Sequence, residues 1–185
     1  PDTGSPANLN DLIETAVSRA YDSSQDDRAW SGVFIAACIR RVAIQLGLEA
    51  MVNGRYIGRD ELLLAHEGHR VYVEEAFRRR FGPGQQSGSY HAFNPSERAV
   101  QVGDIIALDR QANAIADVVD FDDIPGLTAR GRRMHGDIVV EVDPPSNSVI
   151  AIGGNLGQSV RRRRYPIDAN GMLVVVREQL LTQES

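Results

Sequence analysis

Three side chains suited to acyl-transfer chemistry stand at the ends of predicted secondary-structure elements in this chain of 185 residues. Ser31 precedes an almost uniformly apolar run, which predicts a buried helix over residues 32–46. His135 opens a run rich in β-branched residues, and Asn155 follows a Gly-Gly pair after the next such run. A hydroxyl, an imidazole and an amide are suitable as a nucleophile, a general base and the group that orients the base. The three residues therefore predict a nucleophilic site if the fold brings them together.

Each of these residues also has a purely structural interpretation. Ser31 can cap the helix by accepting a hydrogen bond from a backbone N–H group. A histidine beside a strand, such as His135, commonly makes hydrogen bonds that only stabilise the fold. An Asn after two glycines, such as Asn155, is a common turn residue. A helix N-terminus stabilises a negative charge by only about 0.3–2 kcal/mol, so Ser31 needs a general base to attack a carbonyl. Cys38 lies about two helical turns beyond Ser31 and is predicted to be a small core residue.

Four short motifs follow one another along the chain. They are Trp30-Ser31-Gly32-Val33-Phe34, Gly103-Asp104, His135-Gly136-Asp137-Ile138-Val139-Val140 and Gly153-Gly154-Asn155. Their order, over residues 28–175, resembles that of NlpC-type and CHAP-type cell-wall hydrolases, and most of all a bacterial branch called domain of unknown function 2272. The resemblance implies a papain-like α+β fold, hydrolysis of amide bonds and a peptidoglycan substrate.

The resemblance also implies roles for individual residues. Ser31 takes the nucleophile position, His135 is the general base and Asn155 orients His135. Trp30 and Gly32 flank the nucleophile, and the backbone N–H groups there can form part of an oxyanion hole. A papain-like site uses a cysteine at this position, so Ser31 is a native nucleophile, a residue engineered from Cys, or the mark of an inactive site. The alternatives are an inactive papain-fold module that binds cell-wall peptide or a partner protein, and an acyl or amide transferase.

The hydrophobic periodicity predicts helices first and strands later. Besides the helix at 32–46, helices are expected over residues 9–21 and 59–80. Strands are expected at residues 104–108, 137–142, 149–152, 159–165 and 172–176. This order indicates an α+β fold with an antiparallel sheet.

The same patterns suggest how the chain is divided. Residues 1–27 are expected to form an N-terminal helix and loop, and residues 28–178 a papain-like domain. Residues 109–134 show little periodicity and are long for a loop, which predicts an insertion or lid within that domain.

Further residues are candidates for binding substrate. His66 and His69 are three residues apart, not the four of a zinc-protease helix, and no third ligand is evident, so neither a metal nor a cofactor is expected. The resemblance suggests that His66 lines the cleft, whereas its structural alternative is a helix-surface residue. In a strand, Arg161 and Arg163 share one side. They predict either a charged edge strand or a clamp for peptide carboxylates.

Composition limits the partners and the location. All 20 basic residues are arginine and the net charge is −5, which argues against nucleic-acid binding. No apolar run approaches the roughly 18 residues of a membrane span, and one cysteine permits no intrachain disulfide. A cell-wall hydrolase is expected to be periplasmic or secreted, with the cytoplasm as the alternative, although no signal peptide is visible. An inhibitory or immunity protein is a further candidate partner for such a hydrolase.

Overall fold

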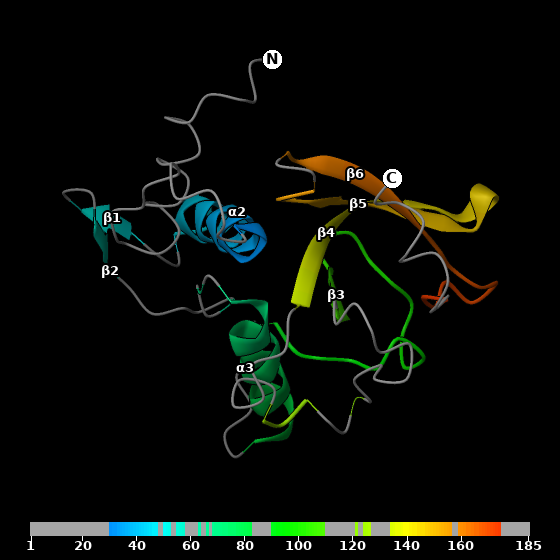
Figure 1. The fold of residues 1–185 in the computed structure, drawn as a ribbon, viewed down its shortest axis with the longest axis horizontal. Helices are drawn as coiled ribbons and strands as arrows, with labels where there is room; N and C mark the ends of the chain where they lie inside the picture. The colour runs from blue at the N-terminus through cyan, green and yellow to red at the C-terminus, as the bar shows by residue number, and fades with distance from the viewer. Residues whose placement is uncertain are drawn as a thin grey trace.

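Two helices precede a four-stranded sheet in the part of the chain that the computed structural model describes. The described residues are 30–47, 50–52, 55–57, 63, 66, 68–82, 90–109, 121, 124–126, 134–156 and 159–174. Helices α2 (Ser31–Gln45) and α3 (His69–Phe81) both contact the sheet, α2 through β4 and β5 and α3 through β4. In Figure 1 the helices lie on one side of the view and the sheet on the other. The predicted α+β class is confirmed.

The sheet is antiparallel throughout, with strand order β3-β4-β5-β6. Its strands are β3 (Ile105–Asp109), β4 (Met134–Asp143), β5 (Ser148–Gly153) and β6 (Arg161–Pro166). All four were predicted, but β4 begins three residues earlier than expected, so His135 lies inside the strand. The fifth predicted strand, at residues 172–176, is reduced in the described residues to an isolated bridge between Ile167 and Leu173.

The segment between the two helices differs from the prediction. A helix was expected over residues 59–80, whereas α3 begins at His69. Gly68 precedes it with extended backbone angles, φ −99° and ψ 119°, which stop the helix from continuing toward the N-terminus. A short hairpin that the sequence did not predict, β1 (Ala50–Val52) and β2 (Arg55–Ile57), lies between the helices along the chain. His69 therefore occupies the first turn of a helix.

Helix α2 matches its predicted range to within one residue, but the predicted cap is wrong. Trp30 occupies the N-cap position, and its carbonyl accepts the Phe34 N–H at 3.0 Å. No side-chain cap hydrogen bond is present. Ser31 is the first residue inside the helix, so its hydroxyl is available for another partner.

Both faces of the sheet are covered by apolar side chains, because successive residues of a strand point to opposite faces. One cluster joins the helices to the sheet and includes Ile35 and Tyr72, which are 0% and 1% exposed. The other cluster contains Ile106, Val139 and Val149 on the second face. Full burial of one such aliphatic side chain stabilises the fold by about 1.5–3 kcal/mol. The sheet is therefore part of the apolar core on both of its faces.

Several sequence predictions lie outside the described residues. These are the helix at 9–21, the N-terminal segment 1–27 and most of the proposed insertion at 109–134. Cys38, predicted to be a core residue, is half-buried in α2, and burial raises the pKa of its thiol.

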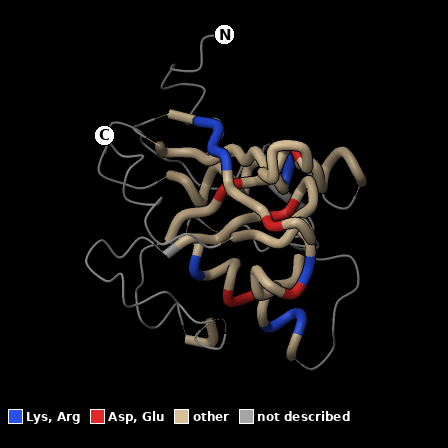
Figure 2. Tube along the Cα trace, turned by 90° about the vertical axis from the view of Figure 1, so that its right-hand side faces the viewer, with Lys and Arg blue, Asp and Glu red and all other residues tan. Residues whose placement is uncertain are grey.

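Charged residues of both signs are spread over the described chain. Figure 2 shows acidic and basic positions both near the sheet and along α3. Strand β6 is one of the two edge strands of this sheet, as the charged-edge interpretation predicts, and Arg162 and Arg164 there pair with Glu141 and Asp143 of β4. None of the described helices is long and apolar enough to cross a membrane.

Candidate active site

Polar side chains are rare in the core of this protein, and most of those present gather at one place. Five polar or charged residues are buried among the described residues, and four of them lie where the N-termini of α2 and α3 meet β4. The four are Ser31, His69, His135 and Asp137, with exposed fractions of 2%, 5%, 0% and 0%. Burying polar groups is costly unless each finds a partner, so the hydrogen bonds of this cluster need to be accounted for one by one.

The first part of the site is a hydrogen-bonded chain of three side chains. Ser31 Oγ lies 2.6 Å from His69 Nε2, and the other ring nitrogen, Nδ1, hydrogen-bonds to the hydroxyl of Tyr72. His69 and Tyr72 are three residues apart in α3, a spacing that places them on one helix face. If the Ser31 hydroxyl donates to Nε2, the ring proton is on Nδ1 and is donated to Tyr72. This is the order nucleophile, base and orienting group.

Tyr72 is held in its neutral form by its surroundings. Burial raises the pKa of its hydroxyl well above the ordinary value, and the negative charge of Asp137 raises it further. In the tautomer with the proton on Nδ1, the neutral Tyr72 hydroxyl accepts a hydrogen bond from Nδ1–H and fixes the ring. The lone pair of His69 Nε2 then faces the Ser31 hydroxyl.

The second part of the site is an imidazole–carboxylate pair on β4. His135 and Asp137 are two residues apart and point to the same face of the strand, which places His135 Nε2 2.7 Å from Asp137 Oδ1. Asp137 Oδ2 accepts a hydrogen bond from the Tyr165 hydroxyl, and Arg163 Nη1 lies 4.0 Å away. The rings of His135 and His69 are 5.7 Å apart between centroids, so the two parts of the site adjoin.

The carboxylate of Asp137 is anionic in these surroundings. Burial alone would raise its pKa, but the hydrogen bonds from His135 and Tyr165 and the nearby charge of Arg163 outweigh it. The pKa of Asp137 is therefore below its ordinary value. His135 Nδ1, in contrast, is buried without a hydrogen-bond partner among the described residues. His135 Nε2 is thus held by Asp137, whereas His135 Nδ1 has no hydrogen bond within the described residues.

The predicted orienting residue makes no hydrogen bond to the imidazole within the described part of the chain. Asn155 is half-buried in the left-handed conformation, with φ 59°, in the turn after β5. No hydrogen bond joins it to His135 within the described residues, and Asp137 holds the nitrogen that Asn155 was expected to orient. The structure also brings His69, not His135, into hydrogen-bonding contact with Ser31.

The predicted substrate-binding residues are spread around the site. Trp30 and Gly32 flank Ser31 and are buried, while His66 accepts the Gly68 N–H at 2.9 Å just ahead of α3. Arg161 is exposed and donates to Ser159, whereas Arg163 approaches Asp137 with its side chain 15% exposed. Of the two arginines, only Arg163 reaches the polar cluster.

Sequence reasoning did not assign roles to His69, Tyr72 or Asp137. The spacing His-x-x-Tyr in an expected helix was a usable signal, because it places an imidazole and a hydroxyl on one face. The spacing of His135 and Asp137 in a strand was another. Among the described residues, no group of three His, Cys, Asp or Glu side chains is arranged to hold a metal ion.

Close backbone approach at two glycines makes the cluster possible. A Cβ at Gly136 would lie 2.6 Å from the Tyr72 hydroxyl and 2.9 Å from His69 Nδ1. A Cβ at Gly153, on the neighbouring strand, would lie 1.8 Å from Asp137 Oδ1 and 2.8 Å from His135 Nε2. Hydrogen at these positions lets α3 and β5 approach β4 closely.

Replacing Gly153 with alanine is expected to lower the free energy of unfolding by about 1–3 kcal/mol, because the added methyl overlaps the His135–Asp137 pair. Urea unfolding followed by circular dichroism measures the loss. Gly68→Ala is a control, since its nearest heavy atom would be His66 Nδ1 at an ordinary 3.4 Å. Equal stability of the two variants would contradict the close packing described here.

The described residues define an α+β protein whose buried polar site joins a Ser–His–Tyr chain to a His–Asp pair. The chain belongs to the bacterial family described as "Uncharacterized protein conserved in bacteria (DUF2272)", whose model matches residues 2–184. No curated protein and no solved structure matches the chain.

Proposed function

We propose that this protein is a hydrolase that cleaves amide bonds in peptidoglycan peptides, with Ser31 as the nucleophile. The observation that carries the proposal is the 2.6 Å hydrogen bond between Ser31 Oγ and His69 Nε2 at the N-terminus of α2. The choice of substrate rests on the resemblance of the motifs to NlpC-type and CHAP-type enzymes. A hydrolase of that substrate acts in the periplasm or outside the cell.

In the proposed reaction, Ser31 Oγ attacks the amide carbonyl carbon while His69 Nε2 takes the hydroxyl proton. The oxyanion that forms is stabilised by backbone N–H groups at the start of α2, where the helix dipole is positive. His69 then gives the proton to the leaving amine, and an ester on Ser31 remains. Water, deprotonated by the same imidazole, hydrolyses that ester and regenerates the hydroxyl.

The His135–Asp137 pair supports this chemistry electrostatically. A positive imidazolium forms on His69 during each step, and the anionic Asp137 lies close enough to raise the pKa of Tyr72, which contacts His69 directly. A negative charge in these low-dielectric surroundings favours that imidazolium. His135 Nδ1, which has no partner among the described residues, is available to hydrogen-bond to a bound substrate.

One observation favours a second candidate, a module that binds cell-wall peptide without cleaving it. Ser31 and His69 are 2% and 5% exposed, so a substrate reaches them only if neighbouring groups move. A buried Ser–His pair can also serve as a structural hydrogen bond in the core. The two candidates differ in whether Ser31 is needed for turnover or only for folding.

The deciding experiment incubates the protein with peptidoglycan sacculi and defined muropeptides, beside the Ser31→Ala and Ser31→Cys variants. Mass spectrometry identifies the products. We expect cleaved stem peptides from the wild type and none from Ser31→Ala, and thermal unfolding checks that both proteins are folded at the assay temperature. Activity only in Ser31→Cys would show that the site works with a thiol nucleophile.

Absence of product from all three proteins, on substrates that a control hydrolase digests, would contradict the hydrolase proposal. Retained affinity of Ser31→Ala for muropeptides in that case would support the binding module instead.

A further inference from the structure

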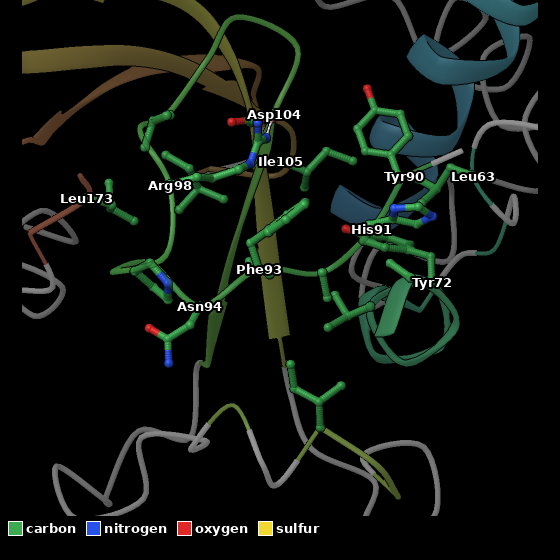
Figure 3. Close-up of a pocket in the computed structure, with 18 residues that line it drawn as sticks. Leu63, Tyr72, Tyr90, His91, Phe93, Asn94, Arg98, Asp104, Ile105 and Leu173 are labelled. Carbon is green, nitrogen blue, oxygen red and sulfur yellow. Dashed lines mark hydrogen bonds and ion pairs between the residues drawn. The ribbon is translucent and has the colours of Figure 1, made fainter. Parts of the chain in front are cut away.

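A cavity of about 180 Å³ lies beside the polar cluster, between α3, β3 and the segment at residues 90–100. Figure 3 shows Tyr72 and His91 on one side of this view, Arg98 on the other side and Phe93 between them. Tyr72 therefore takes part in both the cavity and the polar cluster, since it lines the cavity and its hydroxyl hydrogen-bonds to His69. An apolar cavity of about 150 Å³ holds a benzene molecule, so this one has room for a single large side chain.

The cavity has an apolar floor and an accessible rim. Its floor includes Leu63, Tyr72 and Ile106, which are at most 6% exposed. Its rim includes Phe93, which is 39% exposed, and Arg98, whose side chain is 35% exposed. A ligand can therefore enter past Phe93 and place an apolar group against Tyr72.

Among the described residues of this lining, Arg98 is the arginine. Its guanidinium lies 4.6 Å from the centroid of the Phe93 ring and donates from Nη2 to Asp104 Oδ1. A guanidinium has five N–H donors, so others remain for a ligand. Because Asp104 already balances the charge of Arg98, the rim favours a neutral acceptor oxygen over a second carboxylate.

We infer that this cavity binds one residue of a peptide, with an apolar side chain of leucine size directed to Tyr72 and a neutral backbone carbonyl that accepts from Arg98. The inference concerns binding alone and does not rest on turnover at Ser31.

The probe is N-acetyl-leucine amide, in separate L and D forms, titrated into the wild type and into Ser31→Ala. A compound of this size is expected to bind in about the millimolar range, which NMR shifts of backbone amides measure well. N-acetyl-alanine amide is expected to bind roughly fifty-fold more weakly, because it lacks three buried carbon groups. N-acetyl-leucine, which carries a carboxylate, is expected to bind more weakly than the amide.

Two variants test the cavity itself. Arg98→Met removes the donor and is expected to weaken binding of N-acetyl-leucine amide by about tenfold or more. Ala76→Leu fills the cavity from α3 and is expected to abolish binding while preserving helix propensity. Arg162→Met is the matched control, because Arg162 is also paired with an acid but lies on β6 away from the cavity.

Saturable binding to either form, with shifts at Tyr72 and Phe93 and the predicted dependence on side chain and variant, supports the inference. Absence of saturation in wild type, or equal binding to wild type, Arg98→Met and Ala76→Leu, overturns it. The titrations include Ser31→Ala, so binding in the cavity is measured even if the protein hydrolyses no peptide. A failure to bind these compounds likewise does not change the outcome of the hydrolysis assay.

Discussion

Replacing His69 with glutamine is expected to lower the rate of stem-peptide cleavage by about 10²–10⁴-fold, the usual contribution of a general base. Glutamine keeps a polar side chain of similar size but cannot take the Ser31 proton at neutral pH. The initial rate of product formation, followed by mass spectrometry, measures the loss. Thermal unfolding of the same variant shows whether the fold has survived.

The comparison with His135→Gln decides which histidine is the base. The papain-like pattern predicts His135, whereas the 2.6 Å contact of Ser31 favours His69. Under our proposal, Tyr72→Phe also reduces the rate, because it removes the partner of His69 Nδ1 while retaining the ring. A His69→Gln protein with full activity, beside an inactive His135→Gln protein, would assign the base to His135.

Replacing Asp137 with alanine is expected to lower the free energy of unfolding by about 3–5 kcal/mol, because it leaves His135 and Tyr165 buried without their shared partner. For a chain of this length, such a loss lowers the melting temperature by about 6–20 °C. Urea unfolding at neutral pH measures the change. Asp143→Ala is a matched control on the same strand, since Asp143 pairs with Arg164 at the surface, and we expect a much smaller loss there.

The same carboxylate makes a defined contribution to acid sensitivity. The pKa of Asp137 in the folded protein is below its ordinary value, so the unfolded chain binds its proton more readily. Its contribution is therefore complete above the unfolded pKa of about 3.9 and is lost as the pH falls through the lower folded value. The difference in unfolding free energy between wild type and Asp137→Asn is expected to shrink below about pH 4. A difference that grows in acid would mean that Asp137 is protonated in the fold.

Much of the architecture could be predicted because it depends on neighbours in the chain. The apolar run after Ser31 makes a buried helix wherever it packs, and the alternating β-branched runs around His135 and Val149 make strands. The start of α3 was missed because the extended backbone of Gly68 outweighed the apolar pattern that precedes it. The residue types alone do not show whether the backbone conformation of Gly68 or the apolar pattern before it sets the start of the helix.

The composition of the site was harder to predict, because its partners come from distant parts of the chain. Ser31 and His69 are 38 residues apart, and their contact depends on how α2 and α3 pack on β4. Two polar side chains, Asp137 and Asn155, were both available to orient His135. The register of β4 and β5 places Gly153 opposite Asp137, so the carboxylate has the space beside the imidazole, and Asn155 lies two residues further on in a left-handed conformation.

The sequence by itself determined the α+β class, the helix that presents Ser31, the strand that carries His135 and the family to which the chain belongs. These follow from local periodicity and from the order of short motifs, which need no knowledge of packing. Only the tertiary structure decided that His69 meets Ser31, that Asp137 holds His135 and that a cavity shares Tyr72 with them. The reason is that hydrogen bonds act over about 3 Å, and a distance of that kind between remote residues is set by helix packing and strand register.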